Sequence, residues 1–193
     1  MAVSSARSRL LARVVDEADR AGLGERSLRD LAATVGTSHR MLIHHFGSRE
    51  GLLVAVVEAV EAAERDRAVT VYSSVGSALD GDPIDAMRRT WRRLSAPAFA
   101  GRERLFFECY ARGLQGEAPF DRLLPGAVTD WLDALEPVGT ESGLTTAQAR
   151  ARARLGLAVV RGLLLDLLAT GDRRATTAAF EAYLTQLGPP GAK

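Results

Sequence analysis

The sequence predicts an all-α fold of about nine helices, and three observations support this class. Apolar residues recur every three or four positions through almost the whole chain, which is the period of a helix buried along one face. The apolar segments begin at serine, threonine, aspartate or proline and end at glycine or proline, as capped helices do. Hydrophobic residues make up 47% of the 193 residues and charged residues 25%, which is typical of a globular chain.

The first helix is expected over residues 4–21, and Gly22 follows as its C-terminal stop. Its charged residues occupy the remaining faces. The apolar stripe consists of Leu10, Leu11, Val14, Val15, Ala18 and Ala21.

Two short helices come next. Ser27 can cap the first of them, and Gly36 ends it because glycine adopts the left-handed conformation without a steric penalty. Ser38 can cap the second. The first helix has apolar residues in the i, i+3, i+4, i+7 pattern, at Leu28, Leu31, Ala32 and Val35. In the second we expect Met41, Leu42, His45 and Phe46 to face inward and His39, Arg40, Ile43 and His44 to face outward.

Two short helices joined by a three-residue turn that contains glycine form a helix-turn-helix. In this motif the second helix enters the DNA major groove, and its N-terminal residues meet base edges. The alternative is an ordinary helical hairpin inside an all-helical protein. The net charge of +1 does not decide between them.

The rest of the chain is also expected to be helical. Ser48 can cap a long helix that ends near residue 78, and Thr145 with Gln148 forms a capping box for another that ends at Gly171. Between them we expect one helix from Pro83 to Pro97, a second over 102–115 and a short helical turn over 119–124. A further helix starts at Pro125 and leads to a loop at 138–144. Asp172 caps the last helix, which ends before Pro189 and Pro190.

Short motifs within residues 28–53 resemble the TetR family of bacterial transcriptional regulators. They are Leu31-Ala32, Gly36-Thr37-Ser38, Leu42-Ile43-His44-His45-Phe46 and Ser48-Arg49-Glu50-Gly51-Leu52-Leu53. The resemblance implies a helix-turn-helix DNA-binding domain over 1–47, and a ligand-binding and dimerisation domain over 48–193 that the long helix joins to it. Beyond residue 53 only the architecture agrees.

The candidate DNA contacts follow from the motif and the resemblance. Arg40 can donate two hydrogen bonds to guanine. Ile43 replaces a tyrosine that contacts phosphate in the family, so it either touches a thymine methyl or packs inward. His45 either contacts phosphate or packs against the core, and the outer residues could instead be merely solvated. The full set is Ser27, Thr37, Ser38, His39, Arg40, Ile43, His44, His45 and Arg49.

Aromatic and soft side chains in the later helices are candidates for a ligand pocket, because such pockets are mostly apolar. The alternative is ordinary core packing. The candidates are Met87, Trp91, Phe106, Phe107, Cys109, Tyr110 and Trp131.

The helix over 145–171 has two apolar faces, which predicts packing both within the subunit and across a homodimer. Two-fold operators need two DNA-reading heads. The candidate interface residues are Leu155, Ala158, Gly162, Leu165, Phe180 and Tyr183, and the alternative is that all of them lie in the intramolecular core.

Several functional classes lack their motifs. No phosphate loop, nucleophile elbow or metal-type spacing of Cys and His occurs, so we expect no enzyme, no cofactor and no metal. No apolar run reaches the roughly 18 residues of a membrane span. The single Cys109 fits a reducing compartment, and we expect a cytoplasmic protein.

The sequence therefore predicts a homodimeric repressor that binds operator double-stranded DNA and that a small hydrophobic ligand releases. A helical dimer that binds DNA constitutively, as an architectural protein, is the alternative. A helical enzyme with an incidental hairpin is a third interpretation.

Overall fold

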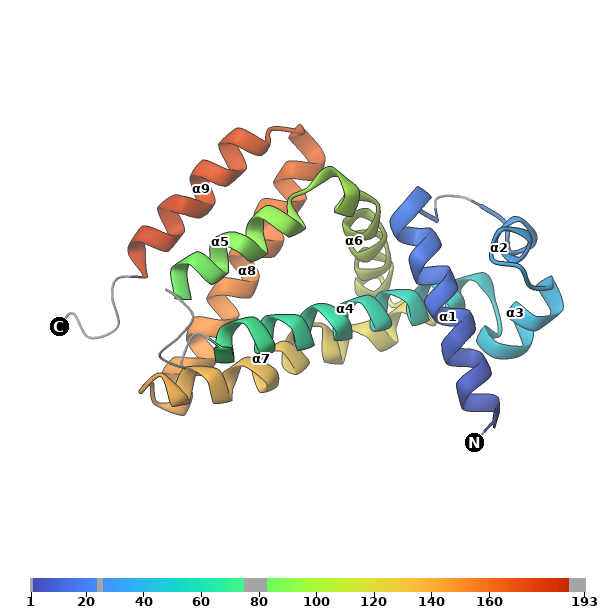
Figure 1. The fold of residues 1–193 in the computed structure, drawn as a ribbon, viewed down its shortest axis with the longest axis horizontal. Helices are drawn as coiled ribbons and strands as arrows, with labels where there is room; N and C mark the ends of the chain where they lie inside the picture. The colour runs from blue at the N-terminus through green and yellow to red at the C-terminus, as the bar shows by residue number, and fades with distance from the viewer. Residues whose placement is uncertain (1, 24–25, 75–82, 188–193) are drawn as a thin grey trace. The chain divides into compact units, whose positions relative to one another are not determined.

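The computed structural model describes residues 2–23, 26–74 and 83–187. Over these ranges the chain forms nine α-helices, two short 3-10 helices and no strand (Figure 1). This confirms the predicted all-α class, and none of the helices so described is long and apolar enough to cross a membrane. The α-helices are α1 (Ala2–Ala21), α2 (Leu28–Thr34), α3 (His39–Phe46), α4 (Arg49–Ser74), α5 (Pro83–Leu94), α6 (Ala100–Leu114), α7 (Leu123–Glu141), α8 (Thr146–Thr170) and α9 (Arg173–Gln186).

The chain packs as two compact units. Unit 1 comprises Met1–Ala62 and Ala98–Pro125, and unit 2 comprises Ala63–Pro97 and Gly126–Lys193. Helix α4 contributes residues to both. This grouping follows packing, whereas the boundary expected after residue 47 divides the chain by function and stays a prediction. The expected end of the fourth helix near residue 78, and the stop at Pro189 and Pro190, lie outside the described residues.

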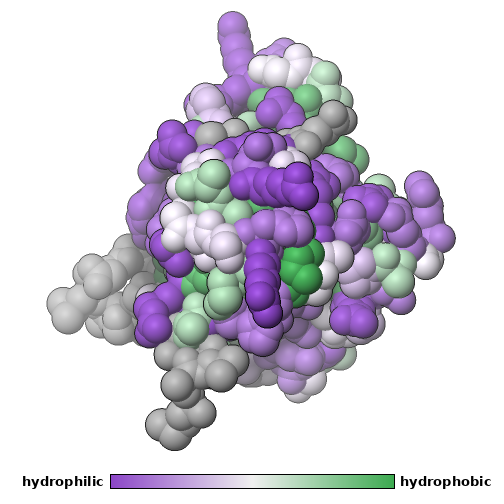
Figure 2. Space-filling model, turned by 90° about the vertical axis from the view of Figure 1, so that its right-hand side faces the viewer, coloured by the Kyte–Doolittle hydropathy of each residue, from purple (hydrophilic) through white to green (hydrophobic). Residues whose placement is uncertain are grey.

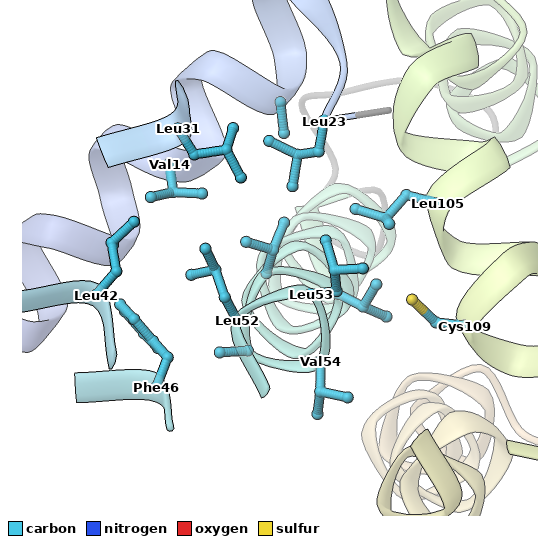
Figure 3. Packing of buried hydrophobic residues seen from close by; sticks show 14 of the residues in the cluster. Val14, Leu23, Leu31, Leu42, Phe46, Leu52, Leu53, Val54, Leu105 and Cys109 are labelled. Atoms are coloured by element: carbon cyan, nitrogen blue, oxygen red, sulfur yellow. The ribbon is translucent and has the colours of Figure 1, made fainter. Parts of the chain in front are cut away.

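The core of unit 1 surrounds the first turns of α4. Leu52 and Leu53 are 0% and 1% exposed. In Figure 3, Leu52 lies on the side of Leu42 and Phe46 from α3, whereas Leu53 lies on the side of α6. Adjacent residues of one helix therefore pack against the helix-turn-helix in one direction and against α6 in the other.

Cys109 of α6 belongs to the same core and is fully buried. Burial raises the pKa of its thiol to about 12, because the apolar surroundings disfavour the thiolate. The thiol is therefore protonated and chemically inert in the folded chain at neutral pH.

Unit 2 contains α5, α8, α9, most of α7 and the second part of α4. In it, α9 packs against both α8 and α5 (Figure 1). Trp91 is 2% exposed and stacks on Phe180 with ring centroids 4.9 Å apart. Its Nε1 donates to the hydroxyl of Thr177 at 3.0 Å, so the indole is satisfied as well as buried. Arg88 of α5 adds an ion pair at 3.0 Å to Glu181.

The prediction of a loop over 138–144 is wrong for its first part, because α7 continues through Pro137 to Glu141. Packing against α8 explains the longer helix. A Cβ at Gly139 would lie 2.7 Å from that of Ala149, so the two helices approach closely there. Arg150 of α8 also binds both Asp133 and Glu136 of α7.

Candidate DNA-binding surface

Side-chain caps fix the start of both short helices. The hydroxyl of Ser27 accepts from the amide of Asp30 at 3.2 Å, and the Asp30 carboxylate accepts in return from the Ser27 amide at 3.3 Å. This is a capping box, which satisfies two amides that a helix start leaves open. The hydroxyl of Ser38 caps α3 by accepting from the amide of Met41 at 3.2 Å.

The turn between the two helices depends on Gly36, whose φ is +65°. A side chain would be strained in this conformation, so glycine allows the chain to turn within the four residues 35–38 that separate α2 from α3. Arg13 of α1 donates to the Gly36 carbonyl at 3.4 Å, which ties the turn to the first helix.

Glu17 connects α1 to the segment that precedes α2. It is only 6% exposed, and it binds Arg20 and Arg26 at 2.6 Å each. Arg26 also donates to the hydroxyl of Thr34 at the end of α2. The hydrogen bonds from Arg26 and then from Arg20 lower the pKa of Glu17, so this nearly buried carboxylate stays charged.

Arg49 begins α4 and is one of the predicted DNA contacts. In the structure its Nε donates to the carbonyl of Arg26 at 3.0 Å. The hydroxyl of Ser48 accepts from the Gly51 amide at 3.0 Å and so caps α4, as the sequence predicted. Arg49 therefore holds the start of α4 against the loop before α2, whatever else its guanidinium binds.

Helix α3 buries two residues, leaves one half-buried and exposes the others. Leu42 is 0% and Phe46 9% exposed, and they form its inner side. The candidate contacts His39, Arg40, Ile43 and His44 are exposed, as are Ser27 and Ser38, whereas Thr37 is half-buried. Figure 2 views the molecule from the side on which Figure 1 draws α2 and α3, where hydrophilic side chains surround small hydrophobic areas.

The expectation that Met41 faces inward is wrong, because its side chain is 41% exposed. In this turn of α3 only one side chain points into the core, and that side chain is Leu42. Ile43 is 38% exposed, so the inward alternative for this residue is also excluded.

His45 is half-buried, with its ring edge-on to that of Phe46 at 6.3 Å. This position allows both the packing role and a phosphate contact, and both stay open. Arg7 of α1, which the sequence analysis missed, donates to the carbonyl of His45 at 3.4 Å and lies over the Phe46 ring at 5.1 Å. It adds a cation at the C-terminal end of α3, and only the tertiary fold brings it there.

The predicted pocket residues divide between the two units. Phe106, Phe107, Cys109 and Tyr110 belong to unit 1, whereas Met87, Trp91 and Trp131 belong to unit 2. Unit 1 has a shallow hollow that includes one of them, Phe106; its lining is Ala18, Val56, Val57, Val60, Glu61, Arg102, Leu105 and Phe106. Trp91 and Cys109 are buried within their own units, which favours the core interpretation for both.

The predicted interface residues also divide. Leu155 and Leu165 of α8 are 54% and 52% exposed, and Ala158 and Gly162 are exposed between them. Phe180 and Tyr183 are 1% and 9% exposed and pack within unit 2, so we remove both from the candidate interface.

Residues 12–56 match the sequence model of a family described as bacterial regulatory proteins, tetR family. The matched stretch runs from α1 through the helix-turn-helix into the first turns of α4. A search of curated proteins finds no relative that matches this chain.

Solved structures match along nearly the whole chain. A TetR-family regulator from Pectobacterium atrosepticum has a TM-score of 0.69 at 22% identity, covering 95% of this chain and 92% of its own. One from Mesorhizobium loti has a TM-score of 0.67 at 18% identity, over 94% and 96%. The multidrug-binding protein EbrR, in complex with imidazole, gives 0.64 at 23% identity, over 98% and 93%.

At these identities the structural matches establish the fold, and the sequence match covers the helix-turn-helix itself. The chain therefore has the fold of these regulators, and its residues 12–56 are similar to the bacterial regulatory proteins of the tetR family.

Proposed function

We propose that this chain is a homodimeric repressor that reads operator DNA with α3 and leaves the operator when a small hydrophobic ligand binds. The observation that carries the proposal is the exposed side of α3, where His39, Arg40 and His44 stand on a helix fixed by Ser38 and Leu42. Arg40 would read guanine, and Ser27, Thr37, Ser38, His45 and Arg49 would bind the backbone around it.

A second feature supports dimerisation. Small and apolar residues repeat along the exposed side of α8 at alternating intervals of three and four, and α9 adds further exposed alanines. Among the described residues of unit 2, no element covers this apolar face. The α8 residues are Ala151, Leu155, Ala158, Gly162, Leu165 and Ala169, and the α9 residues are Ala175, Ala178, Ala179 and Ala182.

A dimer would give the protein two copies of α3 for the two halves of an operator. Such half-sites lie roughly 34–36 Å apart, or multiples of that distance. A ligand that binds better to a form with another head spacing lowers operator affinity by the difference in its two binding free energies. The fold shared with EbrR, which binds imidazole, supports a search for ligands among small aromatic compounds.

The proposed dimer can be tested at Gly162, because a Cβ there meets nothing within 4 Å of its own chain. Gly162→Trp should leave the protomer folded but separate the subunits, and light scattering should give the monomer mass. Operator binding should be lost with it. The matched control is Ala111→Trp, which adds the same side chain at an exposed position of α6. A dimeric Gly162→Trp variant with normal binding would place the interface elsewhere.

Repression and release are tested on a duplex selected by the wild-type chain from a random library. A footprint on that duplex is expected, and a compound from a panel of small aromatic and aliphatic molecules, imidazole included, should remove it. A footprint that no compound changes would favour the constitutive architectural dimer. The absence of any sequence-specific footprint would refute operator reading.

A further inference from the structure

Large hydrophobic side chains with high exposure are few in the part of the chain that the structure describes. They are Met41, Ile43, Leu114, Leu155 and Leu165. Leu155 and Leu165 belong to the α8 face proposed for dimerisation. Two of the remaining three lie on α3, a helix of only eight residues, so its exposed side is more apolar than a purely phosphate-binding surface requires.

The positions of Met41 and Ile43 on α3 are symmetrical. Successive residues of an α-helix are rotated by about 100°. Leu42 and Phe46 define the inner side, so Arg40 and His44, one turn apart, form a row on the outer side. Met41 and Ile43 then lie about 80° to either side of that row.

This arrangement cannot relax by rotation of the helix. Leu42 is fully buried, and the amide of Met41 is bonded to the Ser38 cap. Turning α3 far enough to bury Met41 would withdraw Leu42 from the core. The apolar flanks are therefore held outward by the fold of the head.

The charge around the two side chains indicates which partner covers them. Arg40 and the three histidines of the chain are all on α3, and Arg7 lies against its C-terminal end. The row of Arg40 and His44, with its apolar flanks, matches the major groove, whose floor combines hydrogen-bonding edges with one apolar group, the C5 methyl of thymine. Methionine and isoleucine cannot bond the polar edges, and covering such an edge without a partner costs free energy.

We infer that Met41 and Ile43 determine operator specificity by each covering a thymine methyl, on either side of the base pair that Arg40 reads. This inference rests on the proposed function and adds what it does not contain, the base preference next to the Arg40 contact. It also assigns a role to Met41, a residue that the sequence had placed in the core.

The test replaces thymine by uracil, which removes the methyl and keeps every hydrogen-bonding group. The probe is the duplex that the wild-type chain selects from a random library. Each thymine is replaced in turn, and affinity is measured by fluorescence anisotropy at fixed salt. Wild type should lose about three- to fivefold in affinity at two positions of each half-site, as expected for one buried methyl.

Single variants then assign the positions. Met41→Ala should abolish the uracil effect at one of the two positions and keep the other, and Ile43→Ala should do the reverse. Leu114→Ala, at the 66% exposed leucine of α6, is the matched control and should keep both effects. Circular dichroism should report unchanged helix content, since both α3 side chains lie outside the core.

The outcomes separate the inference from the function on which it rests. If wild type binds its selected duplex equally well with uracil, the methyl contacts do not exist, although operator reading stands. The same holds if both alanine variants lose affinity equally on thymine and uracil duplexes. If no sequence is selected at all, operator reading fails too, and Met41 and Ile43 contact a partner of another class.

Discussion

Glu17 is almost completely buried in unit 1, yet its carboxylate stays ionised because Arg20 and Arg26 donate hydrogen bonds to it. Its lowered pKa means that the folded head prefers the carboxylate. The stabilisation is present above the pKa of an unfolded glutamate, about 4.3, and is lost as the pH falls through the lower, folded pKa.

Glu17→Gln should therefore lower the melting temperature at pH 7 and have less effect near pH 3. Thermal unfolding of both proteins between pH 3 and pH 7 measures the difference. Asp16→Asn, an exposed carboxylate on the same helix, provides the control. An equal loss at both ends of the range would show that the ion pairs are not what Glu17 contributes.

Arg40 and Arg29 offer a comparison between base reading and backbone binding. Both are exposed, Arg40 on α3 and Arg29 on α2. Arg40→Ala should cost about 1–3 kcal/mol on the selected duplex and relax the preference at one base position. Arg29→Ala should at most weaken all sequences alike and reduce the salt dependence. Selection from a random library with each variant makes the comparison, and an unchanged preference in Arg40→Ala would refute its assignment.

At the scale of the helices, the caps connect sequence and structure most directly. Ser27→Ala removes one side of the capping box at α2 and should reduce the free energy of unfolding by about 1 kcal/mol. Chemical denaturation measures the loss. Thr146→Ala is the control, because it removes a hydroxyl beside the cap of α8 rather than at it. Equal losses in the two variants would contradict the role of the capping box.

Local chemistry explains which helices could be predicted. Ser27, Ser38 and Thr145 each bond the amide that the sequence pattern implies, and the starts of α2, α3 and α8 follow. The end of α7 was missed because its continuation past Pro137 depends on contacts with α8, a partner that no local pattern reveals. Periodicity likewise identified α3 as amphipathic. It could not show that, of the four apolar residues of α3, Leu42 and Phe46 are buried whereas Met41 and Ile43 are exposed.

For the molecule as a whole, the motifs in residues 28–53 were enough to predict both the match of residues 12–56 to the tetR family and the shared fold. The division of the apolar residues between core and exposed face could not be predicted, because an apolar face looks the same in sequence whether its own chain or a partner covers it. Leu155 and Phe180 are both apolar and helical, but only Phe180 is enclosed by Trp91.

A ligand that releases the operator should also change the environment of unit 2, which contains both tryptophans of the chain. The change in emission and the loss of DNA binding should follow the same concentration dependence, since one conformational equilibrium links them. Titration of the full chain with and without its selected duplex makes the measurement. Phe107→Ala should shift the ligand titration more than the ligand-free affinity, and equal shifts would count against a ligand role for Phe107.

Trp91→Ala should act differently, because its indole is stacked and bonded within unit 2. We expect a loss of about 3–5 kcal/mol in the free energy of unfolding. A selective loss of ligand response without loss of stability would instead identify Trp91 as a binding residue.

The burial of Cys109 has a consequence for how the folding of this chain can be followed. The only thiol lies in unit 1 and both indoles lie in unit 2, so the unmodified chain has one natural reporter in each unit. A thiol reagent at pH 8 should react only when unit 1 opens, whereas tryptophan emission follows unit 2. If both signals change at the same denaturant concentration, the two units unfold as one cooperative body. If the two signals change at different concentrations, one unit can unfold while the other stays folded.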